Sequence, residues 1–136
     1  ILKGILHPQD ALQAQRLGFA GVVVSNHGGR ALEGSPASLA VLPQVRAAVG
    51  DDFMLLLDGG IRRGSDVFKA LALGAQAVLL GRPQAYGLGA AGALGVAQML
   101  RLLREELELT MALAGCATLA DISSACLVNP NEFSSC

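Results

Sequence analysis

A histidine and an arginine follow a strongly apolar stretch of this chain. The stretch covers residues 21–25, and His27 and Arg30 come directly after it with two glycines between them. Branched apolar residues in an unbroken run predict a buried strand. In parallel α/β proteins, ligands bind in the loops at the carboxyl ends of the strands. Imidazole acts as a base near neutral pH, and a guanidinium pairs with a carboxylate, so this loop is a candidate catalytic site.

Polar residues stand at the ends of other apolar runs as well. The side chains expected on this rim are Lys3, Ser25, His27, Arg30, Asp58, Arg62 and Arg82. Each one alone is compatible with an ordinary turn, but together they place chemistry at the end of every predicted strand. The backbone N–H groups of Gly59, Gly60 and Gly81, with the two arginines that follow them, predict a phosphate site.

Strand and helix patterns alternate along the sequence. The predicted strands cover 2–6, 21–25, 53–57 and 77–80, and the clearest helices cover 9–17, 65–73 and 93–114. Pro36 and Pro43 are each expected to start a short helix, because proline fits the first helical turn. The uncharged, glycine-rich segment that begins at Pro83 is expected to be a loop leading into the last helix, not a membrane span.

The predicted strands are apolar on both faces, which is typical of a parallel sheet covered on both sides. A doubly wound sheet and a (β/α)₈ barrel both fit this order. The glycines follow several strands and do not form one G-x-G-x-x-G turn, which favours the barrel. A full barrel takes about 250 residues, whereas this chain has 136 and begins at Ile1 within a predicted strand. We therefore expect the C-terminal half of a TIM barrel and a fragment of a longer protein.

The composition excludes some classes of partner. Ten Lys and Arg against eleven Asp and Glu leave a net charge of −1, which provides no attraction for nucleic acid or an anionic membrane surface. Hydrophobic residues make up 52%, enough for a sizeable core. Cys116, Cys126 and Cys136 have no metal-ligand spacing, so we interpret them as structural or incidental thiols and expect no metal. An odd number of cysteines suits a reducing compartment, and we expect a cytoplasmic protein, with a peroxisomal or membrane-associated location left open.

Several motifs together resemble the FMN-dependent α-hydroxy acid oxidases and dehydrogenases, the family of glycolate oxidase, lactate oxidase and mandelate dehydrogenase. The matching segments are 2–4 (LKG), 25–30 (SNHGGR), 58–64 (DGGIRRG), 66–75 (DVFKALALGA), 81–83 (GRP) and 106–116 (ELELTMALAGC). The resemblance covers residues 1–122 and corresponds to strands five to eight of the family's barrel. It leaves 123–136 as an unassigned tail.

The resemblance implies roles at one end of the site. His27 would be the catalytic base, taking a proton either from the substrate α-carbon or from its hydroxyl while a hydride moves to the flavin. Arg30 would pair with the substrate carboxylate. Lys3 would lie near flavin N1 and O2 and stabilise negative charge there. Ser25 would hydrogen-bond to the edge of the isoalloxazine ring.

The resemblance also implies the residues that hold the rest of FMN. Asp58 would bond to ribityl hydroxyls. The residues expected around the ribityl and phosphate groups are Gly59, Gly60, Arg62, Gly81 and Arg82.

The implied activity is FMN-dependent oxidation of an L-2-hydroxy acid to the 2-oxo acid, after which oxygen or another acceptor reoxidises the flavin. The resemblance also implies that the full-length protein is a homo-oligomer. In this family the first half of the barrel supplies an aspartate that orients the histidine, so we expect the chain alone to turn over little or not at all. Two alternatives stay open. One is a non-catalytic half-barrel that binds FMN or phosphate. The other is a different nucleotide barrel, such as type 2 isopentenyl diphosphate isomerase or an inosine monophosphate dehydrogenase relative, which does not explain His27 followed by Arg30.

Overall fold

The computed structural model describes residues 1–128 and contains one parallel sheet. Its strands are neighbours in chain order: β1 (Leu2–Ile5), β2 (Gly21–Val24), β3 (Met54–Leu57) and β4 (Ala77–Val78). Because every strand runs in the same direction, all of their carboxyl ends meet at one edge. The α/β class and the parallel order are as predicted. Residues 129–136, which include Cys136, lie outside the described part.

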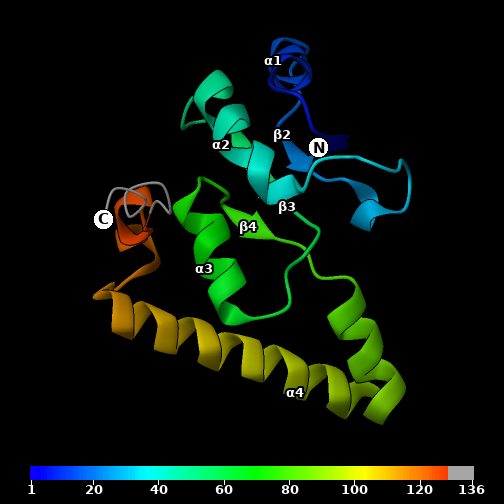
Figure 1. Ribbon diagram of the computed structural model, residues 1–136, viewed down its shortest axis with the longest axis vertical. Helices are drawn as coiled ribbons and strands as arrows, with labels where there is room; N and C mark the ends of the chain where they lie inside the picture. Colours follow the sequence, from blue (N-terminus) through cyan, green and yellow to red (C-terminus); the bar gives the residue numbers. More distant parts are fainter. Residues whose placement is uncertain (129–136) are drawn as a thin grey trace, which may run out of the picture.

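Helices return the chain from each strand to the next (Figure 1). The connecting helices are α1 (Pro8–Arg16), α2 (Ser38–Val49) and α3 (Gly64–Ala72), and α4 (Arg82–Ala114) follows β4. The short 3-10 turn η1 (His27–Gly29) lies between β2 and α2, whereas η2 (Leu119–Asp121) and η3 (Ser124–Cys126) follow α4.

The main core lies between one face of the sheet and the helices. Alternate side chains of the central strands point to this face, and four of them are almost completely buried. They are Val22, Val24, Leu55 and Leu57. On the opposite face of β3, Met54 is 40% exposed. A sheet with helices on a single face is the arrangement that a section of a (β/α)₈ barrel would have.

Two predictions about helix boundaries are wrong. Pro43 does not start a helix but lies inside α2, which begins at Ser38. A proline within a helix removes one backbone hydrogen bond. Burial of Leu42 and Val45 against the sheet on the same helix compensates for that loss. Tertiary packing has here overridden a local signal.

The glycine-rich segment after Pro83 is not a loop. It forms a first helical arm of α4, which is separated from the long second arm by a break at Ala91 and Gly92, where φ is −152° and 58°. A Cβ added to Gly87 would lie 2.8 Å from the carbonyl oxygen of Gly95, so these glycines let the two arms pack backbone to backbone. In residues 1–128 no helix combines the length and the apolarity that crossing a membrane needs.

Candidate functional site

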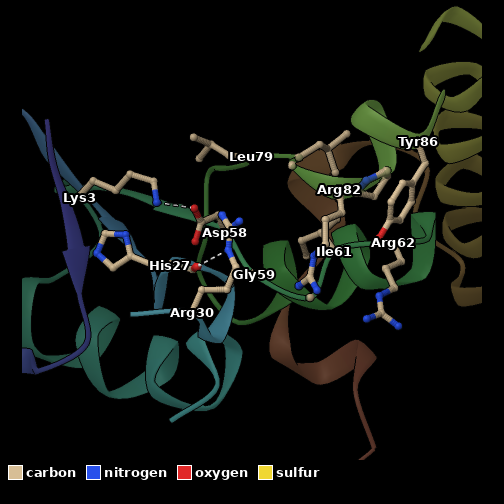
Figure 2. A pocket seen from close by; sticks show the side chains of 15 residues that line it. Lys3, His27, Arg30, Asp58, Gly59, Ile61, Arg62, Leu79, Arg82 and Tyr86 are labelled. Carbon is tan, nitrogen blue, oxygen red and sulfur yellow. Dashed lines mark hydrogen bonds and ion pairs between the residues drawn. The ribbon is translucent and has the colours of Figure 1, made fainter. Parts of the chain in front are cut away.

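A cleft of about 770 Å³ opens at the carboxyl edge of the sheet (Figure 2). All of the site residues predicted from the sequence line it except Ser25, which is buried and bonded to the cleft residue Lys3. Lys3 and His27 stand at one end, Asp58 is central, and Arg62 stands at the other end. Arg82 begins α4 at that end, and its side chain extends back toward the histidine loop, where a Cβ added at Gly28 would lie 3.8 Å from its Nη2. The topology explains this convergence, because Lys3 lies in β1 and the other residues follow β2, β3 or β4 of the same parallel sheet.

Lys3 is held by two partners at the floor of the cleft. Its Nζ lies 2.5 Å from Asp58 Oδ2 and donates a hydrogen bond of 2.8 Å to Ser25 Oγ. The serine is completely buried, and its hydroxyl oxygen also accepts a hydrogen bond of 3.1 Å from the backbone N–H of His27. Ser25 therefore links the lysine on β1 to the loop that carries the histidine.

Only one of the two carboxylate oxygens of Asp58 has a partner among the described residues. Its Oδ2 pairs with Lys3, whereas its Oδ1 is buried and has no hydrogen-bond partner within residues 1–128. A buried carboxylate oxygen without a donor is costly, because its lost hydration is not replaced. This oxygen is therefore suited to accept a hydrogen bond from a hydroxyl group of a ligand.

The backbone of His27 is in the left-handed region, with φ of 56°. Its imidazole packs against Gly4 on β1, where an added Cβ would lie 2.8 Å from Nε2. Gly4 itself has φ of +95° and falls where the β1–β2 register shifts between Lys3 and Ile5. The sequence reasoning did not assign Gly4 to the site, although a glycine inside a strand is a known signal of a bulge or a close approach.

Asn26 holds the shape of the histidine loop and was also missed as a site residue. Its Oδ1 accepts a 3.2 Å hydrogen bond from Gly29 N, and its Nδ2 donates one of 3.2 Å to Pro36 O. Its own N–H donates to Ser38 Oγ at 3.1 Å. Asparagine commonly caps its own turn in this way, which is the signal that would have found it.

Arg30 is anchored more loosely than the other site residues. It is exposed, and its Nε donates to the carbonyl oxygen of His27 at 3.5 Å. Its side chain extends from the histidine loop into the middle of the cleft, toward Asp58 (Figure 2). Arg30 and His27 therefore line the same cleft from one loop.

Backbone N–H groups near the two distal arginines differ in availability. At the start of α3, the N–H groups of Arg62 and Arg63 both donate to Asp66 Oδ2 at 3.0 Å, and that of Gly64 donates to Glu106 Oε2 at 2.9 Å. These N–H groups therefore already have carboxylate acceptors within the chain and are not available to a ligand.

The backbone N–H groups at the start of α4 have no such carboxylate acceptors within the described residues. Within residues 1–128, no side chain caps this helix start, and Gly81 has open space where a Cβ would stand. Arg82, its first residue, and Arg62 both line this end of the cleft, with Tyr86 beside them (Figure 2). A helix start with uncapped N–H groups and two guanidinium groups has the chemistry that binds a phosphate dianion.

Comparison with known proteins identifies the family of this chain. The family model described as FMN-dependent dehydrogenase matches residues 1–129. The chain belongs to the FMN-dependent dehydrogenase family. An L-lactate oxidase from Alicycliphilus denitrificans is 63% identical over 122 residues, covering 90% of this chain and 33% of that protein. A peroxisomal (S)-2-hydroxyacid oxidase from Arabidopsis thaliana is 54% identical over 132 residues, covering 97% of this chain and 36% of that protein.

Solved structures of the family have the same fold over this segment. Mandelate oxidase bound to 3,3-difluoro-2-hydroxy-3-phenylpropionic acid superposes with a TM-score of 0.87 at 50% identity, covering 90% of this chain and 37% of that one. The chain therefore spans about a third of the length of the FMN-dependent dehydrogenases it matches. The expectation of a partial (β/α)₈ barrel is confirmed.

The cleft fits the cofactor of the FMN-dependent dehydrogenases in three respects. Its cationic end at Arg62 and Arg82 suits the phosphate, and the unpartnered Asp58 Oδ1 suits a ribityl hydroxyl. Lys3, at the opposite end, suits the ring, where negative charge develops on reduction. The order of these groups along the cleft is the order of the parts of FMN.

Proposed function

We propose that this chain forms the FMN- and substrate-facing portion of an enzyme that oxidises 2-hydroxy acids to 2-oxo acids. The observation that carries the proposal is one continuous cleft, with His27 and Lys3 at one end, Asp58 and Arg30 in the middle and an uncapped helix start with two arginines beyond them. The relatives are named for lactate, 2-hydroxy acids, glycolate and mandelate, which all share a hydroxyl group beside a carboxylate. That shared unit defines the proposed substrate class.

Each residue at the catalytic end has a separate task. Arg30 pairs with the substrate carboxylate and orients the neighbouring carbon toward His27. His27 removes a proton from the substrate, and its backbone contact with Ser25 keeps the imidazole over Gly4. FMN, when bound, accepts the electron pair that leaves the substrate. Lys3, paired with Asp58, supplies positive charge near the place where that negative charge arrives.

A second function, FMN binding without turnover, is favoured for the isolated chain by one observation. Within residues 1–128, the His27 interactions are made by its backbone N–H and carbonyl, and no carboxylate is hydrogen-bonded to its ring. A catalytic imidazole depends on such a partner to hold its tautomer and to stabilise its protonated form. We therefore expect this chain alone to bind FMN and to reduce it slowly or not at all.

Titration of the chain with FMN and with riboflavin, followed by flavin fluorescence, tests the binding part of the proposal. FMN is expected to bind at least about tenfold more tightly than riboflavin, because a dianion paired with two arginines is worth more than 1.4 kcal/mol. Arg82→Gln is expected to reduce this preference, whereas Arg101→Gln, outside the cleft on α4, serves as the matched control. Equal affinities for FMN and riboflavin would refute the phosphate assignment.

The catalytic part needs the chain within a complete barrel. There, an L-2-hydroxy acid added without oxygen is expected to bleach the flavin absorbance at a rate that His27→Gln lowers by at least about 100-fold, with FMN still bound. A variant that bleaches as fast as the parent would remove His27 from its assigned role. The homo-oligomeric state, the location in the cell and the division into a 1–122 domain and a tail stay predictions.

A further inference from the structure

Two cysteines meet away from the cleft, at the far end of α4. The chain leaves this helix at Gly115 and folds back through η2 and η3, which brings Cys126 Sγ to 3.6 Å from Cys116 Sγ. Figure 1 shows these turns beside α3 and the end of α4. Cys116 is 7% exposed and belongs to a small second core with Phe68 and Ile122. The two thiols also share one acceptor, the carbonyl oxygen of Asp121, at 3.8 Å from each sulfur.

We propose that Cys116 and Cys126 form a redox-active thiol pair that a hydroperoxide oxidises reversibly to a disulfide. A disulfide requires a sulfur–sulfur distance of about 2.05 Å, so the two sulfurs need to approach by only about 1.5 Å. Cys126 lies in η3, a single 3-10 turn in which it is the last residue, so a side-chain rotation and a small backbone shift suffice. The proposal is independent of the proposed function, because the oxidant can come from solution.

The surroundings assign different roles to the two thiols. Hydrogen bonds from the backbone N–H of Ser123 and from the Cys116 thiol lower the pKa of Cys126, which is also the more exposed of the two. Burial raises the pKa of Cys116 above the ordinary value of a thiol. The thiolate is the form that attacks peroxides, so Cys126 reacts first and Cys116 resolves the product.

The two steps balance as follows. The Cys126 thiolate sulfur attacks one peroxide oxygen, the O–O bond breaks, and the departing hydroxide takes a proton to become water, which leaves a sulfenic acid. Cys116 sulfur then attacks Cys126 sulfur, the S–O bond breaks, and the hydroxyl group leaves as water with the Cys116 proton. Overall, two thiols lose two electrons and two protons to one hydrogen peroxide, which becomes two molecules of water.

The bond would fasten the segment after α4 onto α3. Phe68 and Ala72 on α3 pack in the same cluster as Cys116, and Leu127 lies against it. Closing a loop between residues 116 and 126 restricts the unfolded chain and also limits opening of these turns. We expect slower amide exchange in residues 117–125 after oxidation.

Treatment of the Cys136→Ser chain with hydrogen peroxide, followed by alkylation and mass spectrometry, tests the pair. We expect loss of two hydrogens, no alkylation, a 116–126 cross-linked peptide and full reversal by dithiothreitol. Uptake of two alkyl groups after peroxide, or only disulfides between two chains, would overturn the proposal. The same measurement on the parent chain, with peptide mapping, shows whether Cys136 competes, and a preferred bond to Cys136 also counts against it.

Variants that keep only one cysteine of the pair separate the two roles. In the Cys116→Ser, Cys136→Ser chain, peroxide is expected to leave a sulfenic acid on Cys126 that a dimedone probe captures. In the Cys126→Ser, Cys136→Ser chain, capture on Cys116 is expected to be at least about tenfold slower, because its pKa is raised and it is buried. Equal capture rates would contradict the assigned order. Alkylation rates of the untreated parent thiols give the same ranking without any substitution at the pair.

Discussion

Substitution of Gly64 by alanine would test how α3 and α4 are joined behind the phosphate end of the cleft. Gly64 is the first residue of α3 and lies directly on the backbone of α4. An added Cβ would lie 2.5 Å from the carbonyl carbon of Glu106 and 2.6 Å from the carbonyl oxygen of Leu103, and it would also collide with the backbone nitrogen of Leu107. All three atoms belong to the main chain, so no side-chain rotation can relieve the overlap.

The expected cost follows from that geometry. Carbon atoms in contact prefer separations of about 3.5–4.0 Å, so the two helices must part by about 1 Å. Overpacking of this kind costs about 1–3 kcal/mol. The separation also weakens the hydrogen bond from Gly64 N to Glu106 Oε2, which is worth about 1 kcal/mol. We therefore expect Gly64→Ala to lower the free energy of unfolding by about 2–4 kcal/mol, the sum of these two contributions.

Urea unfolding of the chain, followed by circular dichroism, measures this loss. Gly89→Ala is the matched control, since Gly89 lies in the first arm of α4 and its added Cβ would meet nothing within 4 Å among the described residues. That change is expected to be neutral or to stabilise by up to about 1 kcal/mol, because alanine favours a helix over glycine. Equal midpoints for Gly64→Ala and the parent chain would refute the proposed contact.

Three further outcomes are expected. Arg46→Lys should lower the free energy of unfolding by about 2 kcal/mol in urea, because a single ammonium nitrogen cannot reach the three backbone carbonyls that the separate nitrogens of this guanidinium hold. Gly4→Ala should displace the imidazole of His27 and slow flavin reduction in a complete barrel by about 100-fold while FMN affinity is unchanged; an unaltered rate would contradict the contact. Hydrogen bonds from the backbone N–H and hydroxyl of Thr118 lower the pKa of Asp121. The stability that this carboxylate gives to the folded C-terminal turns is therefore present above its unfolded-state pKa and is lost as pH falls through its folded-state pKa. Asp121→Asn should remove this acid-dependent part of the amide-exchange protection in the C-terminal turns, and protection that falls equally with pH in both proteins would show that another group is responsible.

Local sequence patterns were sufficient to predict the strands and the residues at their ends. Unbroken apolar runs mark the strands, and glycines and charged residues mark where those runs stop. The expected burial of both faces is not seen in this chain, because Met54 on the face without helices is 40% exposed. In a parallel sheet every strand end faces the same edge, so Lys3, His27, Asp58 and Arg82 were expected together without any knowledge of distances. The order of the groups along the cleft follows from the same topology.

Local patterns failed where a distant partner determines the conformation. Pro43 was expected to begin a helix, but burial of the neighbouring leucine and valine keeps it inside α2. Gly87 looked like a loop residue, but it is helical because Gly95 allows the second arm of α4 to approach its backbone. In both segments, contacts with residues distant along the chain determined the conformation against the local preference.

The amino-acid sequence alone indicated the family through the motifs that it shares with that family. Its short-range periodicity predicted the parallel order of the strands and the polar groups near their ends. The tertiary structure alone decided the contact of Gly4 with His27, the contact of Gly64 with α4 and the meeting of Cys116 with Cys126. These contacts join residues on different segments, and their geometry depends on how whole helices pack. Side-chain packing acts over a few ångströms in space and has no regular spacing along the chain.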